Sequence, residues 1–115
     1  MGDAEMKAVV VEHFGGPEVL QARSVPMPVP GSGEVRVRLM ATGVNPVETY
    51  IRAGAYGAVP SLPYVPGNDG AGIVDAVGAG VENVQVGERV FVAATGAKRN
   101  TGTYATSVVC DAAAV

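Results

Sequence analysis

Residues 34–54 read EVRVRLMATGVNPVETYIRAG, and they contain the clearest strand and the clearest helix of the chain. Over Glu34–Thr42, apolar side chains alternate with Arg36, Arg38 and Met40. A period of two places successive side chains on opposite faces of an extended chain. The pattern therefore predicts a half-buried β-strand. Its predicted buried face consists of Val35, Val37, Leu39 and Ala41.

The residues that follow this strand predict a short helix from about Pro46 to Ala53. Asn45 is a preferred N-cap residue, and proline is favoured at the first helical position. Glu48 lies three residues after the cap, where its side chain can reach back to the amide of Asn45. Gly54 is a natural stop.

The rest of the chain predicts a mainly β domain. Residues 1–5 are expected to be a flexible lead, and residues 95–102 a flexible loop. Pro26, Pro28 and Pro30 favour an extended edge or connector, because proline cannot donate to a central strand. Six short strands, one helix and many turns favour a partly open β-barrel or a sandwich over residues 6–115. The five other strands are predicted at Met6–Glu12, Val19–Val25, Ala71–Val77, Arg89–Ala94 and Thr103–Cys110.

Composition narrows the class of protein. A chain of 115 residues supports one domain, and its net charge of −3, without a basic stripe, argues against nucleic-acid binding. No apolar run approaches the length of a membrane span. Cys110 is the only cysteine, so no internal disulfide can form, and a buried thiol is expected. We therefore expect a cytoplasmic protein with no nucleic-acid and no membrane partner.

Two stretches resemble the active-site face of a known enzyme family. Gly43–Arg52 reads GVNPVETYIR and Leu62–Gly72 reads LPYVPGNDGAG, and both are similar to the zinc-independent, NADPH-dependent quinone oxidoreductases that include zeta-crystallin. Phe14–Leu20, FGGPEVL, adds a family-like N-terminal signature. These enzymes are medium-chain dehydrogenases/reductases. The resemblance implies their GroES-like catalytic domain, a partly open β-barrel with one or two short helices.

The resemblance also implies a reaction. Hydride would pass from NADPH to a quinone or an activated alkene such as an enone. The Rossmann domain that would bind most of the cofactor is absent from these residues, so we expect the isolated chain to be inactive. Gly78–Asn83 starts like a dinucleotide fingerprint, but the chain turns at Gly87 before a helix could follow.

Three candidate site residues follow from the resemblance. Asn45 and Tyr50 are implied to be catalytic and to contact the cofactor, and Tyr56 to line the same cleft. The residues alone have plainer explanations: Asn45 caps the helix, Tyr50 is a half-buried packing residue and Tyr56 is an exposed loop aromatic. A tyrosine hydroxyl could stabilise the negative charge that hydride addition builds on a substrate oxygen.

No catalytic zinc is expected. The resemblance implies that Asn45 and Asn68 stand where zinc-dependent members of the wider family carry a cysteine and a histidine ligand. The only histidine, His13, lies in the first predicted turn. A zinc alcohol dehydrogenase fragment therefore lacks the ligands it needs.

A non-enzymatic role remains the alternative. A GroES-like barrel could assemble through its edges or bind partners through its loops, as co-chaperonins do. Such a module should form a large closed ring, whereas the enzyme interpretation predicts a monomer or a homodimer. A measurement of native mass would separate the two.

Overall fold

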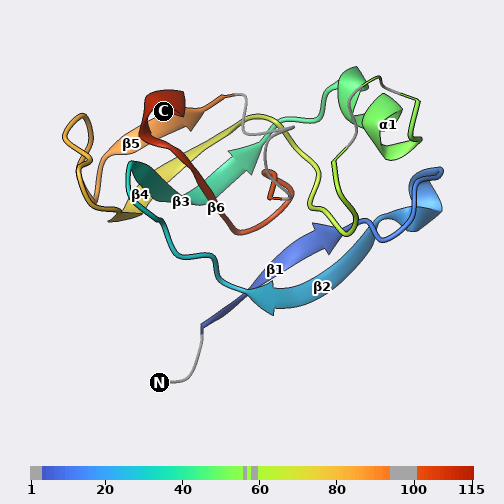
Figure 1. The fold of residues 1–115 in the computed structure, drawn as a ribbon, viewed down its shortest axis with the longest axis horizontal. Helices are drawn as coiled ribbons and strands as arrows, with labels where there is room; N and C mark the ends of the chain where they lie inside the picture. Colours follow the sequence, from blue (N-terminus) through green and yellow to red (C-terminus); the bar gives the residue numbers. More distant parts are fainter. Residues whose placement is uncertain (1–3, 56, 58–59, 94–100) are drawn as a thin grey trace.

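The computed structural model describes residues 4–55, 57, 60–93 and 101–115, and they form a mainly β structure in two sheets (Figure 1). A two-stranded sheet pairs β1 with β2, and a four-stranded sheet has the order β5-β4-β3-β6. Within the described residues the sheets do not join into one closed barrel. The strands are β1 (Glu5–Val10), β2 (Gln21–Pro26), β3 (Glu34–Thr42), β4 (Gly70–Val77), β5 (Arg89–Val92) and β6 (Ser107–Asp111).

Strand β3 has the predicted bounds and lies between β4 and β6, antiparallel to both. Val35 and Val37 are completely buried, as the alternation predicts. The prediction fails for Ala41, which is exposed, because the register with β4 shifts between Leu39 and Ala41 and interrupts the alternation. The apolar core of this sheet consists of Val35, Val37, Val74, Val92, Val108 and Cys110.

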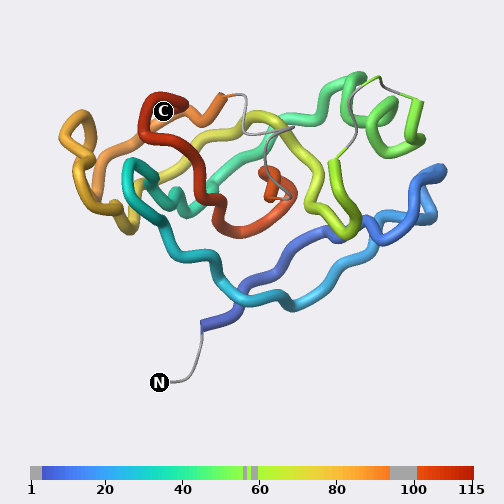
Figure 2. The backbone as a smooth tube through the Cα atoms, viewed as in Figure 1, coloured from blue at the N-terminus to red at the C-terminus, as the bar shows by residue number. Residues whose placement is uncertain are grey.

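The segment before β6 joins the two sheets. Val9 N–H donates to Tyr104 O at 2.8 Å, Thr106 N–H donates to Lys7 O at 3.0 Å and Leu39 N–H donates to Thr106 O at 2.8 Å. The backbone trace shows this segment between the hairpin and the larger sheet (Figure 2). Because these residues bond to two different strands, β6 begins only at Ser107, and the predicted strand start at Thr103 is wrong.

Other element bounds differ in small ways. β1 begins at Glu5, inside the expected lead, and β2 begins at Gln21 because Pro17–Val19 forms a 3-10 turn, η1. A second 3-10 turn, η2 (Ala112–Ala114), follows β6. The expected flexible loop at 95–102 lies largely outside the described residues. Cys110 is buried, as predicted.

Helix α1 (Pro46–Arg52) follows β3, and the sequence signals for its start and end are confirmed. Asn45 is the N-cap, Pro46 is the first helical residue and Ala53 is the C-cap. Gly54 has a φ of +76°, a left-handed conformation that suits glycine after a helix end. The helix is short, so tertiary contacts must supply most of its stability.

Candidate active site

The inward face of α1 carries a buried carboxylate. Glu48 is only 5% exposed, and it is the one side chain that carries a charge at neutral pH among the buried residues of the described chain. Burial of a carboxylate is costly unless hydrogen bonds replace the lost water. The surroundings of Glu48 meet that requirement.

Both oxygens of Glu48 accept two hydrogen bonds each. Oε1 accepts from the backbone N–H of Asn45 at 2.8 Å and from the hydroxyl of Tyr104 at 2.7 Å. Oε2 accepts from Nδ2 of Asn45 at 3.1 Å and from the backbone N–H of Asn68 at 3.1 Å. A carboxylate offers about four lone-pair positions, so its capacity is filled.

Asn45 is tied to a second carboxylate as well. Its Nδ2 donates to Oδ1 of Asp69 at 3.1 Å. We call Asn45, Glu48, Asn68, Asp69 and Tyr104 the Glu48 network. The network joins the start of α1 to the turn before β4 and to the segment before β6.

Tyr104 is positioned by close packing between two loops. Its backbone N–H donates to Pro66 O at 2.9 Å. A side chain at Gly67 or at Gly102 would collide with the opposing loop, since a Cβ at Gly102 would lie 2.2 Å from Pro66 O. The two glycines therefore allow the approach that brings the Tyr104 hydroxyl to Glu48.

Burial and the Glu48 carboxylate raise the pKa of Tyr104 above its ordinary value, because both disfavour the phenolate. Burial also raises the pKa of Tyr64, and the positive charge of Arg52 opposes that shift. Both phenols therefore stay protonated at neutral pH, and Tyr104 acts as a hydrogen-bond donor.

The outward face of α1 carries Tyr50, which is 56% exposed. Tyr50 and Glu48 are two residues apart on the helix, so their side chains lie on different faces. Asn45 is half-buried and belongs to the Glu48 network. Tyr56 lies outside the described residues. The structure thus places Asn45 and Tyr50 at the same short helix, one at its cap and the other on its exposed side.

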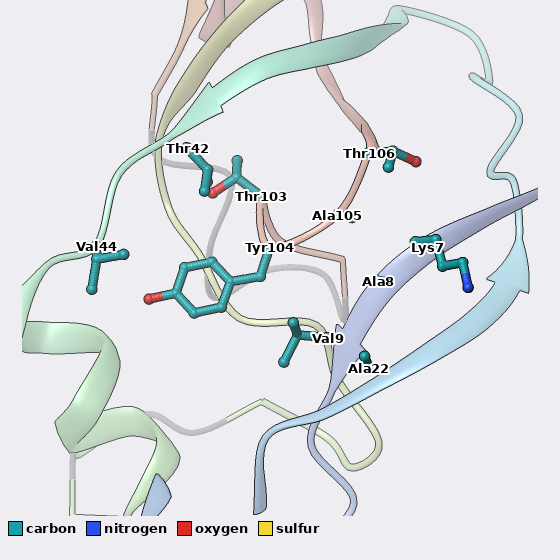
Figure 3. A pocket seen from close by; sticks show the side chains of 10 residues that line it. All are labelled: Lys7, Ala8, Val9, Ala22, Thr42, Val44, Thr103, Tyr104, Ala105 and Thr106. Atoms are coloured by element: carbon teal, nitrogen blue, oxygen red, sulfur yellow. The ribbon is translucent and has the colours of Figure 1, made fainter.

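Two pockets lie near the start of α1 and share Val44 and Tyr104. The smaller, of about 230 Å³, is lined by Leu20, Val44, Glu48, Thr49, Arg52, Pro66 and Tyr104. The larger, of about 390 Å³, lies between the β1–β2 hairpin, the end of β3 and the segment before β6. In Figure 3 the Tyr104 side chain points from that segment towards α1.

A cluster of metal-ligating side chains is not found in the described part of the chain. There, no group of three or more His, Cys, Asp or Glu side chains could hold a metal ion. Asn68 stands beside the Glu48 carboxylate, to which its backbone N–H donates. A helix long and apolar enough to cross a membrane is also not found among the described residues.

Sequence reasoning missed most of the Glu48 network. It assigned Glu48 only to the helix cap, and that hydrogen bond is present. It gave no role to Tyr104 and no side-chain partner to Asp69. An isolated Asn-Asp pair or a tyrosine in a strand-like run carries no signal of such a contact. The one signal in the sequence was Glu48 itself, a glutamate on the side of the predicted helix that faces the protein.

Known proteins resemble this chain along most of its length. Residues 31–115 match the model of the alcohol dehydrogenase GroES-like domain. The quinone oxidoreductase of Rattus norvegicus is 52% identical over 95 residues, which cover 82% of this chain and 29% of that protein. A quinone oxidoreductase of Pseudomonas aeruginosa is 47% identical over 87 residues, 76% of this chain and 26% of that protein.

Solved structures give the same result. The Escherichia coli quinone oxidoreductase complexed with NADPH superposes with a TM-score of 0.86 and 37% identity, covering 94% of this chain and 32% of that one. The chain thus spans about a third or less of the length of these relatives. It belongs to the GroES-like domain family of the alcohol dehydrogenases, and its relatives there include quinone oxidoreductases of the medium-chain dehydrogenase/reductase family.

Proposed function

We propose that this chain is the catalytic domain of a zinc-independent, NADPH-dependent oxidoreductase that reduces quinones or enones. The observation that carries the proposal is the exposed Tyr50 side chain on a helix whose opposite face is fixed by the Glu48 network. The helix lies in a region that is about half identical to quinone oxidoreductases. A relative of the same fold is described as complexed with NADPH.

Tyr50 would act on the substrate oxygen. NADPH, when bound, supplies a hydride, and the protein supplies position and electrostatics. Reduction of a quinone or an enone builds negative charge on an oxygen, which an aimed hydrogen-bond donor stabilises. A hydroxyl on a fixed helix meets that need without a metal. Asn45, Tyr50 and Tyr56 would together contact the nicotinamide end of the cofactor.

A chimera tests this function. The chain would replace the matching N-terminal part of the rat quinone oxidoreductase, and the rest of that protein would supply the nucleotide-binding domain. We expect the chimera to oxidise NADPH with a quinone and the isolated chain to show only background turnover. Without the domain that anchors the cofactor, the reacting groups are not held together, and a misplacement of about 1 Å already costs roughly a hundredfold.

Two results would contradict the proposal. One is a folded chimera that binds NADPH and reduces neither quinones nor enones. The other is an isolated chain that assembles into a large closed ring by native mass measurement, since an enzyme domain should be a monomer or a homodimer. Elemental analysis of the active chimera should find far less than one zinc per chain. Stoichiometric zinc would argue against the metal-free chemistry.

A further inference from the structure

The larger of the two pockets, of about 390 Å³, has mostly apolar walls. Its apolar lining comes from β1, β2, the turn between β3 and α1, and the segment before β6, and includes Val9, Ala22, Val44 and Ala105. We call this pocket the hairpin groove. Its volume lies within the usual range for sites that bind small molecules. Figure 3 shows the one charged residue of the lining, Lys7, with its amine directed away from Val44.

Polar groups at the hairpin groove are occupied within the protein or out of reach. The Tyr104 hydroxyl donates to Oε1 of Glu48 at 2.7 Å, and the Thr42 hydroxyl donates to Asp69 O at 3.2 Å. The hydroxyl of Thr103 has no partner in the described chain, but this residue is completely buried. Water in the groove therefore finds few hydrogen-bond partners. An apolar group that displaces such water gains affinity.

The smaller pocket is less suited to an apolar ligand. Its lining includes Glu48 and Arg52, so it presents both a carboxylate and a guanidinium. Arg52 is partly exposed, and an apolar ligand there would remove water from its guanidinium. Loss of water around a charged group costs free energy unless a new partner replaces it. Of the two pockets, the hairpin groove is therefore the one that favours an apolar ligand.

The hairpin groove begins beside the start of α1. Val44 directly precedes the N-cap Asn45, lines both pockets and is 74% exposed. Helical side chains lean towards the N-terminal end of their helix. Tyr50 therefore leans towards the end of α1 at which Val44 lies, and a rise of about 1.5 Å per residue separates the two by on the order of 8 Å. A ligand oxygen at Tyr50 leaves the groove within reach of a substituent several carbons long.

We propose that the substrate carries an apolar substituent, an alkyl or prenyl chain, which the hairpin groove binds while the quinone or enone oxygen lies at Tyr50. The inference rests on the proposed function and specifies its substrate class. The residues of the groove touch no reacting atom. They determine which substrate is preferred, whereas the hydride transfer itself takes place at α1.

A series of benzoquinones that carry methyl, propyl, pentyl and heptyl substituents tests the groove in the chimera. Each methylene that enters the groove leaves water, so kcat/KM should rise about two- to fourfold per methylene until the groove is filled. The gain should appear mainly as a lower KM, because the chain contacts the protein equally in the ground state and the transition state. A kcat/KM that is independent of chain length, in a chimera that reduces the unsubstituted quinone, would overturn the inference and leave the proposed function intact.

Ala22→Asp tests where the substituent binds. Ala22 is exposed on β2 and lines the groove, so the change introduces a carboxylate there, and the rise of kcat/KM with chain length should disappear. Val29→Asp is the matched control, because Val29 is 80% exposed and does not line the groove. This variant should keep the full rise. Since the rise is a ratio within one variant, a general change in activity does not alter it. An unchanged rise in Ala22→Asp would place the substituent elsewhere and contradict the inference.

The isolated chain gives an independent test, because binding in the groove needs no cofactor. Titration with heptylphenol, a redox-stable probe with the same chain, should shift the methyl NMR signals of Val9, Ala22 and Ala105 and leave those of Val29 unchanged. If none of the three groove signals moves at saturating probe, the groove does not take an alkyl chain and the inference is wrong. A chimera that reduces no quinone of the series would contradict the proposed function, and the substrate class assigned to the groove would fail with it.

Discussion

The inward and outward faces of α1 differ in what fixes their residues. Glu48, on the inward face, is 5% exposed and holds three separate segments of the chain through hydrogen bonds. Tyr50, on the outward face, is 56% exposed. The buried carboxylate of Glu48 is fully occupied by hydrogen bonds within the protein, whereas the exposed hydroxyl of Tyr50 on the same helix stays available to a ligand. We therefore expect changes on the inward face to lower stability and changes on the outward face to lower activity.

The largest effect is expected from Glu48→Ala. This change leaves four donors without their acceptor, and each buried unsatisfied group costs about 1–3 kcal/mol. Some of them will regain water, so we expect the free energy of unfolding to fall by about 3–5 kcal/mol, near the upper limit for one substitution. Urea denaturation of the chain measures it. Glu12→Ala is the control, since its ion pair with Arg23 is half exposed and should contribute less than about 1 kcal/mol. Equal losses in the two variants would show that the buried Glu48 network stabilises the chain no more than an exposed ion pair does.

Tyr50→Phe should give the converse result. In the chimera, loss of the hydroxyl should lower kcat and kcat/KM together by about a hundred- to a thousandfold, the usual effect of removing one such donor. The free energy of unfolding should stay within about 0.5 kcal/mol, because the ring remains and the hydroxyl is exposed. A higher KM for NADPH with a normal kcat would instead assign Tyr50 to cofactor binding. Unchanged kinetics would make it a packing residue.

Val37→Ala compares the Glu48 network with the apolar core of the larger sheet. Val37 is fully buried, and its truncation removes about two methylene equivalents at roughly 0.8 kcal/mol each, with a cavity term in addition. We expect a loss of about 2 kcal/mol in urea denaturation, less than for Glu48→Ala. Val29, 80% exposed, is the matched control and should change stability by less than about 0.5 kcal/mol. A larger loss at Val37 than at Glu48 would show that the core, and not the network, is the more sensitive region.

The smallest effect concerns Tyr104 and alkaline pH. Its pKa is raised above the ordinary value of 10.0, so folding favours the neutral phenol. The contribution of Tyr104 to the free energy of unfolding is fully present below pH 10.0 and is lost as the pH rises above that value. The reason is that the phenol of Tyr104 loses its proton in the unfolded chain at a lower pH than in the folded chain. Tyr104→Phe should cost about 1 kcal/mol at neutral pH and should weaken this alkaline decline. Part of the alkaline decline should remain in this variant, because the pKa of Tyr64 is raised too. An identical decline in the Tyr104→Phe variant would exclude Tyr104 as a cause.

Local patterns predicted several elements well. The alternation in Glu34–Thr42 gave β3 its bounds, and the cap, proline and glycine signals placed α1 to within one residue. These predictions are correct because strand alternation and helix capping each depend on residues within about four positions along the chain. The start of β6 was misplaced because residues 103–106 bond to both β1 and β3, a choice that no local pattern encodes. The roles assigned to Asn45, Tyr50 and Tyr56 stay predictions.

The sequence by itself determined the mainly β class, the central strand, the short helix and the family to which the chain belongs. These depend on side-chain periodicity, capping chemistry and a contiguous motif, which are all read along the chain. Only the tertiary structure decided what the carboxylate of Glu48 does. Its partners Asn68 and Tyr104 are 20 and 56 residues away, so their contacts exist only once three loops have packed together. A buried carboxylate must be satisfied by whatever the fold brings to it, and that requirement turned a helix-capping residue into the centre of the candidate site.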